Sequence, residues 1–216
     1  KRDAFANFDR DLATTDSRVL NRPGAFAALF HASFPGYRDP VLALKTEEPG
    51  SKQLLAIHAG RIDAIARDLV NHLVNDIAVM GAEPLTMLDM IICSRLESET
   101  VQRIIAELAL ACREQGCSLV GGETSEQPGV VTEGAYVLSA SMVGVVERAR
   151  IVDGQSIKAG DVVLAVASDG LHTNGYTLVR ALIDRDPRLV QRDVDGETFL
   201  KSALRPHRSY RDLCLI

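Results

Sequence analysis

The feature that most constrains how this chain can fold is a long amphipathic segment that runs from Arg61 to Met80. Its apolar residues recur at steps of three and four, which is the spacing of a helix with one buried face. They are Ile62, Ile65, Leu69, Leu73, Ile77 and Met80. At about 100° per residue, the flank of this stripe carries a polar row made of Asp68, His72, Asn75 and Asp76. The sequence therefore predicts a helix that packs against a core and has polar side chains along the border of its buried face.

Other segments are predicted to alternate between strands and helices. Runs rich in apolar and β-branched residues predict strands over 41–44, 85–93, 117–120, 135–146 and 161–167. Further helices are expected over 101–112, with Ser98 as a cap, over 176–183, and from Tyr210 onward. Several predicted strands lead into polar loops, and α/β and α+β proteins tend to build binding sites at such places.

Length and charge restrict the classes of function. With 216 residues, the chain can hold one large domain, or one domain and the start of a second, and we expect the second arrangement. Its net charge of -5 gives no basic field for a nucleic-acid backbone, so a small-molecule substrate is the better expectation. No apolar run approaches the roughly 20 residues that cross a bilayer, and no secretory stretch opens the sequence. We therefore expect a soluble protein with no nucleic-acid or membrane partner.

The cysteines and the chain ends lead to two further expectations. The 4 cysteines lie at irregular spacings without a C-x-x-C pair, which argues against a zinc site or a disulfide framework and favours the reducing cytoplasm. The first residue is Lys1 rather than Met, and residues 213–216 stop inside an apolar pattern without a breaker. We expect both ends to be cut.

Two polar clusters contain carboxylates that could meet a cation. The segment 46–52 is Thr-Glu-Glu-Pro-Gly-Ser-Lys, where the acids could hold Mg²⁺ and Lys52 could meet a phosphate. Asn75 and Asp76 lie on the helix flank, where a half-buried carboxylate needs a cation or a donor to offset its desolvation. A solvated charged turn and ordinary helix-surface polarity remain open as the respective alternatives. For His72 alone, a packed or solvated side chain is the favoured interpretation.

Two more clusters combine glycines, acids and amides. The segment 121–129 opens with a glycine pair, which lets backbone amides approach a ligand, and Glu123 follows as a hard oxygen ligand. The segment 172–176, His-Thr-Asn-Gly-Tyr, stands at a predicted strand-to-helix junction, where free helix amides suit phosphate or carbonyl binding. A simple glycine turn, and helix capping by Thr173 or Asn174, remain open alternatives.

Several strings taken together are far more specific than any one of them. They occupy 68–70 with 74–76, 81–84, 117–124, 144–147 and 172–180. The patterns G-G-E-T-x-E-x-P-G and H-[ST]-N-G-Y-[ST]-L-V-R occur in this order and spacing. Through them the chain resembles the aminoimidazole ribonucleotide synthetase family, from about Gly24 to its end.

The resemblance implies an α+β fold. The expected unit is the amino-terminal domain of that superfamily, with a mixed β-sheet, flanking helices and dimerisation through the sheet, followed by the start of an α/β second domain. The expected boundaries are an amino-terminal arm over 1–23, an ATP-binding and dimerisation domain over 24–149, and the beginning of a truncated carboxy-terminal domain over 150–216. A cytoplasmic homodimer is implied.

The resemblance also implies a reaction and a set of site residues. The reaction is the ATP-dependent ring closure of formylglycinamidine ribonucleotide to aminoimidazole ribonucleotide in purine biosynthesis, with Mg²⁺ and release of ADP and phosphate. The carboxylates at the family's metal- or nucleotide-associated positions are Glu47, Asp76 and Glu123. Nucleotide binding is implied for Lys52, Asn75, Gly121, Gly122 and Thr124. The polar string beside the substrate supplies the expected catalytic residues, His172 and Asn174.

One string departs from the family pattern. The family usually has Thr-Asp-Gly-Val-Gly-Thr-Lys where this chain has 46–52, so Glu48 replaces a glycine and Pro49 replaces a valine, and both restrict the backbone. The residues before Gly24 also lack the family's opening string of glycine and tyrosine. A non-catalytic nucleotide-binding paralogue, or a dimerising scaffold of the same superfamily, is therefore the alternative function. The signature cysteines or acids of three related enzymes are not visible: selenophosphate synthetase, thiamine-monophosphate kinase and the hydrogenase-maturation member.

Overall fold

The centre of the molecule is a mixed sheet of 4 strands in the order β1-β4-β2-β3. The computed structural model describes residues 16–20 and 25–215, so most of the predicted arm over 1–23 lies outside the described residues. The strands are β1 (Pro40–Glu47), β2 (Glu83–Cys93), β3 (Ser118–Glu126) and β4 (Tyr136–Glu147). The strand β4 runs antiparallel to β1 and β2, whereas β2 and β3 are parallel. The prediction of a mixed sheet is confirmed.

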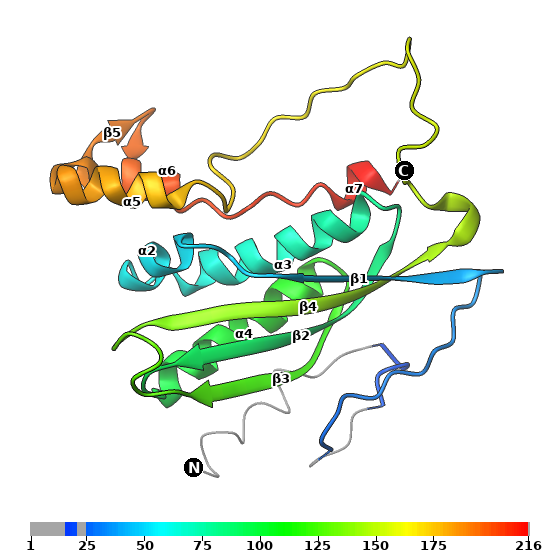
Figure 1. Cartoon of the computed structure of the whole chain (residues 1–216), viewed down its shortest axis with the longest axis horizontal. Helices are drawn as coiled ribbons and strands as arrows, with labels where there is room; N and C mark the ends of the chain where they lie inside the picture. Colours follow the sequence, from blue (N-terminus) through cyan, green and yellow to red (C-terminus); the bar gives the residue numbers. More distant parts are fainter. Residues whose placement is uncertain (1–15, 21–24, 216) are drawn as a thin grey trace.

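Two long helices cover one face of this sheet (Figure 1). The helix α3 (Ile62–Ala78) follows the short α2 (Lys52–His58), and α4 (Ser98–Glu114) supplies the crossover that the parallel pair of β2 and β3 requires. The predicted apolar stripe is confirmed from Ile62 to Ile77, because Ile65, Leu69 and Leu73 are completely buried, whereas Met80 lies beyond the end of α3 and is 41% exposed. Within the described residues, no helix is both long and apolar enough to span a membrane.

The other face of the sheet is open and apolar. Successive side chains along a strand point to opposite faces. In β4, Leu138, Ala140 and Met142 are buried in the core formed with the helices. On the opposite face, large apolar side chains are exposed to solvent: Leu42 by 51%, Leu44 by 73%, Leu88 by 43% and Met90 by 37%.

The chain after the sheet begins with a long extended stretch (Figure 1). The prediction of a buried strand over 161–167 is wrong, because these residues form no strand and Val162, Val163 and Leu164 are exposed by 84%, 92% and 83%. A strand needs a neighbouring strand for its backbone hydrogen bonds. No strand of the described part of the chain lies alongside this stretch.

The remaining elements are short, apart from the predicted helix over 176–183. That helix is present as α5 (Tyr176–Arg185), and it is followed by a 3-10 turn, η3 (Pro187–Gln191), and the hairpin of β5 (Asp193–Val194) and β6 (Glu197–Thr198). The last elements are α6 (Phe199–Ala203) and α7 (Arg211–Cys214), and α7 is the helix predicted from Tyr210.

Between α6 and α7 the chain returns and lies along α3 (Figure 1). Two residues of the polar row, Asp68 and Asn75, together with Asn71, hold the backbone of this returning segment. Asn71 donates from Nδ2 to the carbonyl of His207 at 2.7 Å, and Asp68 accepts from the amide of His207 at 2.7 Å. Asn75 binds both the carbonyl of Arg208, at 2.8 Å, and the amide of Tyr210, at 2.7 Å. The polar row is therefore partly a structural clamp.

Candidate functional site

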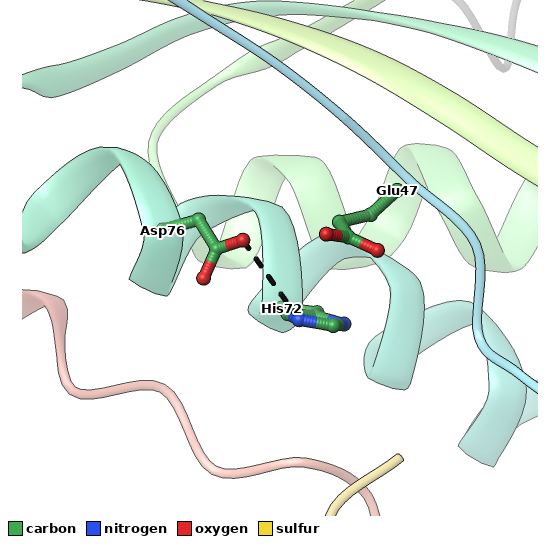
Figure 2. A group of neighbouring side chains, drawn as sticks. All are labelled: Glu47, His72 and Asp76. Atoms are coloured by element: carbon green, nitrogen blue, oxygen red, sulfur yellow. Dashed lines mark ion pairs between the residues drawn. The ribbon is translucent and has the colours of Figure 1, made fainter. Parts of the chain in front are cut away.

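The end of β1 and the second half of α3 meet at one end of the sheet. Glu47 ends β1, while His72 and Asp76 lie one turn apart on α3. One ligand atom from each of these side chains lies within 4.8 Å of the other two. Figure 2 shows the three side chains gathered between β1 and α3. The structure thus brings together Glu47 and Asp76, two of the three predicted metal carboxylates, and adds His72, for which a packed or solvated role was favoured.

A lysine ammonium lies between the two carboxylates. The Nζ atom of Lys45 is 2.7 Å from Oε1 of Glu47 and 3.0 Å from Oδ2 of Asp76. Burial alone would raise the pKa of Glu47, but the hydrogen bond from Lys45 and the charge of His72 outweigh it and lower that pKa. The hydrogen bonds to Glu47 and Asp76 raise the pKa of Lys45. The place between the carboxylates therefore favours a positive charge.

The loop that carries the predicted catalytic residues touches this group. Thr173, only 3% exposed, lies with Oγ1 at 3.3 Å from Nδ1 of His72. The loop after β1 packs closely against the loop at Thr173, because a Cβ added to Gly50 would lie 2.9 Å from the carbonyl oxygen of Thr173. Gly50 has a φ of +63°, so glycine fits both the backbone and the close approach.

His172 lies beside the polar row rather than among the carboxylates. Its ring stacks on that of His207 at 4.0 Å between centroids, and its Nε2 is 3.1 Å from the hydroxyl of Tyr210. Burial, and then the charges of Lys52 and His72, lower the pKa of His172. Burial lowers the pKa of His207 further, to about 3, with smaller contributions from His172, His72 and Lys52. Both imidazoles are therefore neutral at pH 7.

Asn174 is exposed, next to the start of α5. The N-cap residue of α5 is Gly175, with a φ of +82° and no side-chain cap hydrogen bond. Helix capping by Thr173 or Asn174, the alternative for this string, is therefore not what the structure shows. The carboxamide of Asn174 faces solvent, where a ligand can reach it.

Lys52 is completely buried and bound to the protein itself. Its ammonium donates to Oδ1 of Asp68 at 2.8 Å, to the carbonyl of His172 at 3.1 Å and to that of Arg205 at 2.6 Å. Burial lowers the pKa of Lys52 and raises that of Asp68 to about 6, and in each case the partner's charge opposes the shift. An ammonium has three donors, so a phosphate would have to displace one of these oxygens. Asn75 is similarly occupied by the returning segment.

Glu123 lies away from this group within the single chain. It belongs to β3, at the edge of the sheet opposite β1, and it pairs with Met90, whose side chain is on the open face. Glu47 pairs with Ala140, which is buried on the helix-covered face. Glu123, the third predicted metal carboxylate, therefore lies on the opposite face of the sheet from Glu47 and at the opposite edge.

The predicted nucleotide-binding residues Gly121, Gly122 and Thr124 form part of β3, which continues to Glu126 instead of ending at residue 120. The simple-turn alternative for the glycine pair is therefore wrong. A Cβ added to Gly122 would lie 2.2 Å from Oδ1 of Asp89 and 2.6 Å from its carbonyl oxygen. The glycine is needed for this close approach of β3 to β2.

Asp89 is a candidate that the sequence analysis missed. It is 8% exposed and lies in the same cross-strand row as Glu47, since both pair with Ala140 of the strand between them. Burial raises its pKa to about 7. The signal was an acid at an inward position of an apolar strand. Lys45 gave no such signal, because it lies beyond the predicted strand over 41–44, and His207 and Tyr210 reach the site only through the return of the chain.

The comparisons with known proteins agree with this architecture. Residues 36–146 match the family described as AIR synthase related protein, N-terminal domain. Proteins named phosphoribosylformylglycinamidine cyclo-ligase from Burkholderia mallei and Burkholderia vietnamiensis are 43% identical over 192 residues, which is 89% of this chain. The chain spans about half the length of these curated relatives, 54%.

Solved structures share the fold at low identity. A thiamine-monophosphate kinase from Stenotrophomonas maltophilia K279a has a TM-score of 0.63 at 18% identity, over 98% of this chain and 63% of its own. The HypE protein of Escherichia coli has a TM-score of 0.60 at 20% identity, over 91% of this chain and 56% of its own. A hydrogenase maturation protein HypE in complex with ATP has a TM-score of 0.53 at 20% identity, over 74% of this chain and 44% of its own. The chain therefore belongs to the AIR synthase related protein family, whose N-terminal domain it contains at residues 36–146.

Proposed function

We propose that this chain works in an ATP-dependent cyclo-ligase of purine biosynthesis, which converts formylglycinamidine ribonucleotide to aminoimidazole ribonucleotide, ADP and phosphate in the cytoplasm. In this proposal residues 24–149 are the ATP-binding domain and residues 150–216 begin the second domain. The relatives named phosphoribosylformylglycinamidine cyclo-ligase support it at 43% identity. The observation that carries it is the meeting of β1, α3 and the loop at Thr173 around two carboxylates.

ATP is the proposed nucleotide, because a protein of the same fold, the hydrogenase maturation protein HypE, is described in complex with ATP. Glu47 and Asp76 would hold the divalent cation of that nucleotide, and Mg²⁺ is the ion expected from the resemblance. Their donor set fits such an ion, because carboxylate oxygens bind hard cations and the ammonium of Lys45 already occupies the place of one. When bound, the cation neutralises phosphate oxygens and favours phosphoryl transfer.

On the substrate side, His172 and Asn174 are the proposed binding residues. A neutral imidazole has one donor and one acceptor, and the pKa of His172 is lowered by burial, so His172 can orient a substrate oxygen without adding charge. Tyr210 and His207 fix its ring. In this proposal Lys52 acts indirectly: its hydrogen bond to the carbonyl of His172 holds the loop that carries His172 in place.

The proposed assembly is a homodimer that buries the open face of the sheet. Exposed apolar patches of this kind mark interaction surfaces, and two copies could cover Leu44 and Met90. Glu123 and Gly121 lie on the same face, so the dimer would bring them to the partner subunit. In this assembly Glu123 and Gly121 would contribute to a site that two subunits build together.

A ring-closure assay tests the proposal. The longest chain that the reading frame encodes is supplied with formylglycinamidine ribonucleotide, ATP and Mg²⁺, and aminoimidazole ribonucleotide and ADP are quantified together. The proposal predicts one ADP for each ring closed, and strongly reduced product for Asp76→Asn. ATP binding without product would support the non-catalytic paralogue instead.

A further inference from the structure

His72 has the contacts of a histidine prepared to bind a metal ion. Its side chain is 16% exposed, and its two ring nitrogens have different neighbours. Nδ1 is 3.3 Å from the buried hydroxyl of Thr173, and Nε2 is 3.8 Å from Oδ2 of Asp76. A histidine that binds a metal generally donates its other ring N–H to an oxygen, which fixes the tautomer and the ring orientation. With Nδ1–H donating to Thr173, the lone pair of Nε2 is free on the side of Asp76.

The three side chains have nearly the spacing that one ion requires. Their ligand atoms lie within 4.8 Å of one another. An ion bound at about 2.1 Å separates neighbouring ligand atoms by roughly 3 to 4 Å, so the group needs to contract by about 1 Å. Glu47 ends a strand and carries a long side chain, so it can supply this movement, whereas His72 and Asp76 share one helical face.

Lys45 marks where the ion would lie. Its ammonium contacts both carboxylates, at 2.7 Å and 3.0 Å, and thus stands in for a cation. The side chain is 37% exposed and comes from the edge strand β1, so it can swing into solvent when a divalent ion enters. A divalent ion brings twice the charge of the ammonium it replaces.

We propose that Glu47, His72 and Asp76 form a site for a divalent first-row transition-metal ion, with Thr173 orienting His72. This inference deepens the proposed function, on which its catalytic meaning rests, by naming the ion class of the same site. Mg²⁺ prefers oxygen ligands, whereas imidazole favours transition-metal ions. The nitrogen of His72 therefore shifts the preference of the site from Mg²⁺ toward ions such as Co²⁺ and Zn²⁺. Three protein ligands leave further positions for water or phosphate oxygens.

Metal binding without nucleotide is the test. The chain is titrated with Co²⁺, and binding is followed by the visible absorption of the ion and by calorimetry, with Mg²⁺ as competitor. We expect one Co²⁺ per chain. His72→Gln should weaken Co²⁺ binding by about 100-fold and change Mg²⁺ binding by less than about threefold, and Thr173→Val should weaken Co²⁺ binding by about tenfold, as for other partners of metal-bound histidines. Lys45→Met should tighten binding of both ions, because the competing ammonium is gone.

His58→Gln is the matched control, because His58 is an exposed histidine at the end of α2, and its Co²⁺ binding should equal that of the unmodified chain. Circular dichroism must show each variant folded. Absence of Co²⁺ binding, or equal binding by the unmodified chain and folded His72→Gln, would overturn the inference. Calorimetry with ATP and Mg²⁺ separates this outcome from failure of the proposed function. If the chain still binds ATP but His72→Gln does not change Co²⁺ binding, only the transition-metal site is ruled out.

Discussion

Replacing Lys52 by Met should destabilise the protein strongly, and more at high pH than at low pH. Lys52 and Asp68 are both completely buried, and the ammonium of Lys52 also holds the carbonyls of His172 and Arg205. Removing one partner of a buried ion pair costs about 3 to 5 kcal/mol, because the other charge stays buried without compensation. Methionine fills a similar volume, so the loss is mainly electrostatic.

The pH dependence follows from Asp68. Burial raises its pKa from 3.8 to about 6 although Lys52 opposes the shift, so removing Lys52 raises that pKa further. A carboxyl whose folded pKa exceeds the unfolded value stabilises the fold when protonated, and that contribution is lost as the pH rises from 3.8 through the folded pKa. Each pH unit in this window removes about 1.4 kcal/mol. In Lys52→Met the pKa of Asp68 lies above 6, so the variant goes on losing stability above pH 6. Its free energy of unfolding should therefore fall further below that of the unmodified chain between pH 6 and pH 8.

Urea unfolding followed by circular dichroism at pH 5 and pH 8 measures this effect. Lys158→Met, at an exposed lysine, is the control and should change the free energy of unfolding by less than about 0.5 kcal/mol. A Lys52→Met variant that loses less than about 1 kcal/mol at pH 8, or the same amount at both pH values, would refute the reasoning.

The remaining predictions concern packing, the cation and the open face. Gly122→Ala should lower the free energy of unfolding by about 1 to 3 kcal/mol, because its Cβ would meet the carboxyl and the backbone of Asp89, and thermal unfolding measures the loss. Asp76→Asn and Glu123→Gln should each weaken binding of ATP with Mg²⁺ by about tenfold in calorimetry while leaving the fold intact, and unchanged binding in both would remove the metal assignment. Leu44→Glu should shift sedimentation from dimer to monomer, because Leu44 is 73% exposed on the open face, and an unaltered dimer would contradict the proposed interface.

Periodicity predicted the parts of the fold that local packing decides. The stripe from Ile62 to Ile77 is buried as expected, and β2 and β4 lie close to their predicted ranges. The boundaries after residue 44 were less predictable. Long-range pairing with β4 extends β1 to Glu47, beyond the predicted strand over 41–44, and α2 begins at Lys52, the last residue of the polar cluster over 46–52.

The rest depends on contacts that no local pattern contains. The helical spacing placed Asp68 and Asn75 on the flank of α3, but their partners are backbone groups more than 130 residues away in the returning segment. The run over 161–167 has the composition of a strand and lacks a neighbouring strand within the described residues. For the site, the resemblance named Glu47 and Asp76 together, and the structure places them near each other, whereas Lys45 and Thr173 join them only through the fold.

A double-mutant cycle on ATP binding tests most directly whether Glu47 and Asp76 hold the same cation. Calorimetry in Mg²⁺ compares the unmodified chain with Glu47→Gln, Asp76→Asn and the double variant. If both carboxylates hold one ion, removing the first already loses much of that ion's contribution. The double variant should then fall short of the sum of the single losses by more than about 0.5 kcal/mol. Losses that add within that margin, or single variants that bind ATP unchanged, would contradict the account.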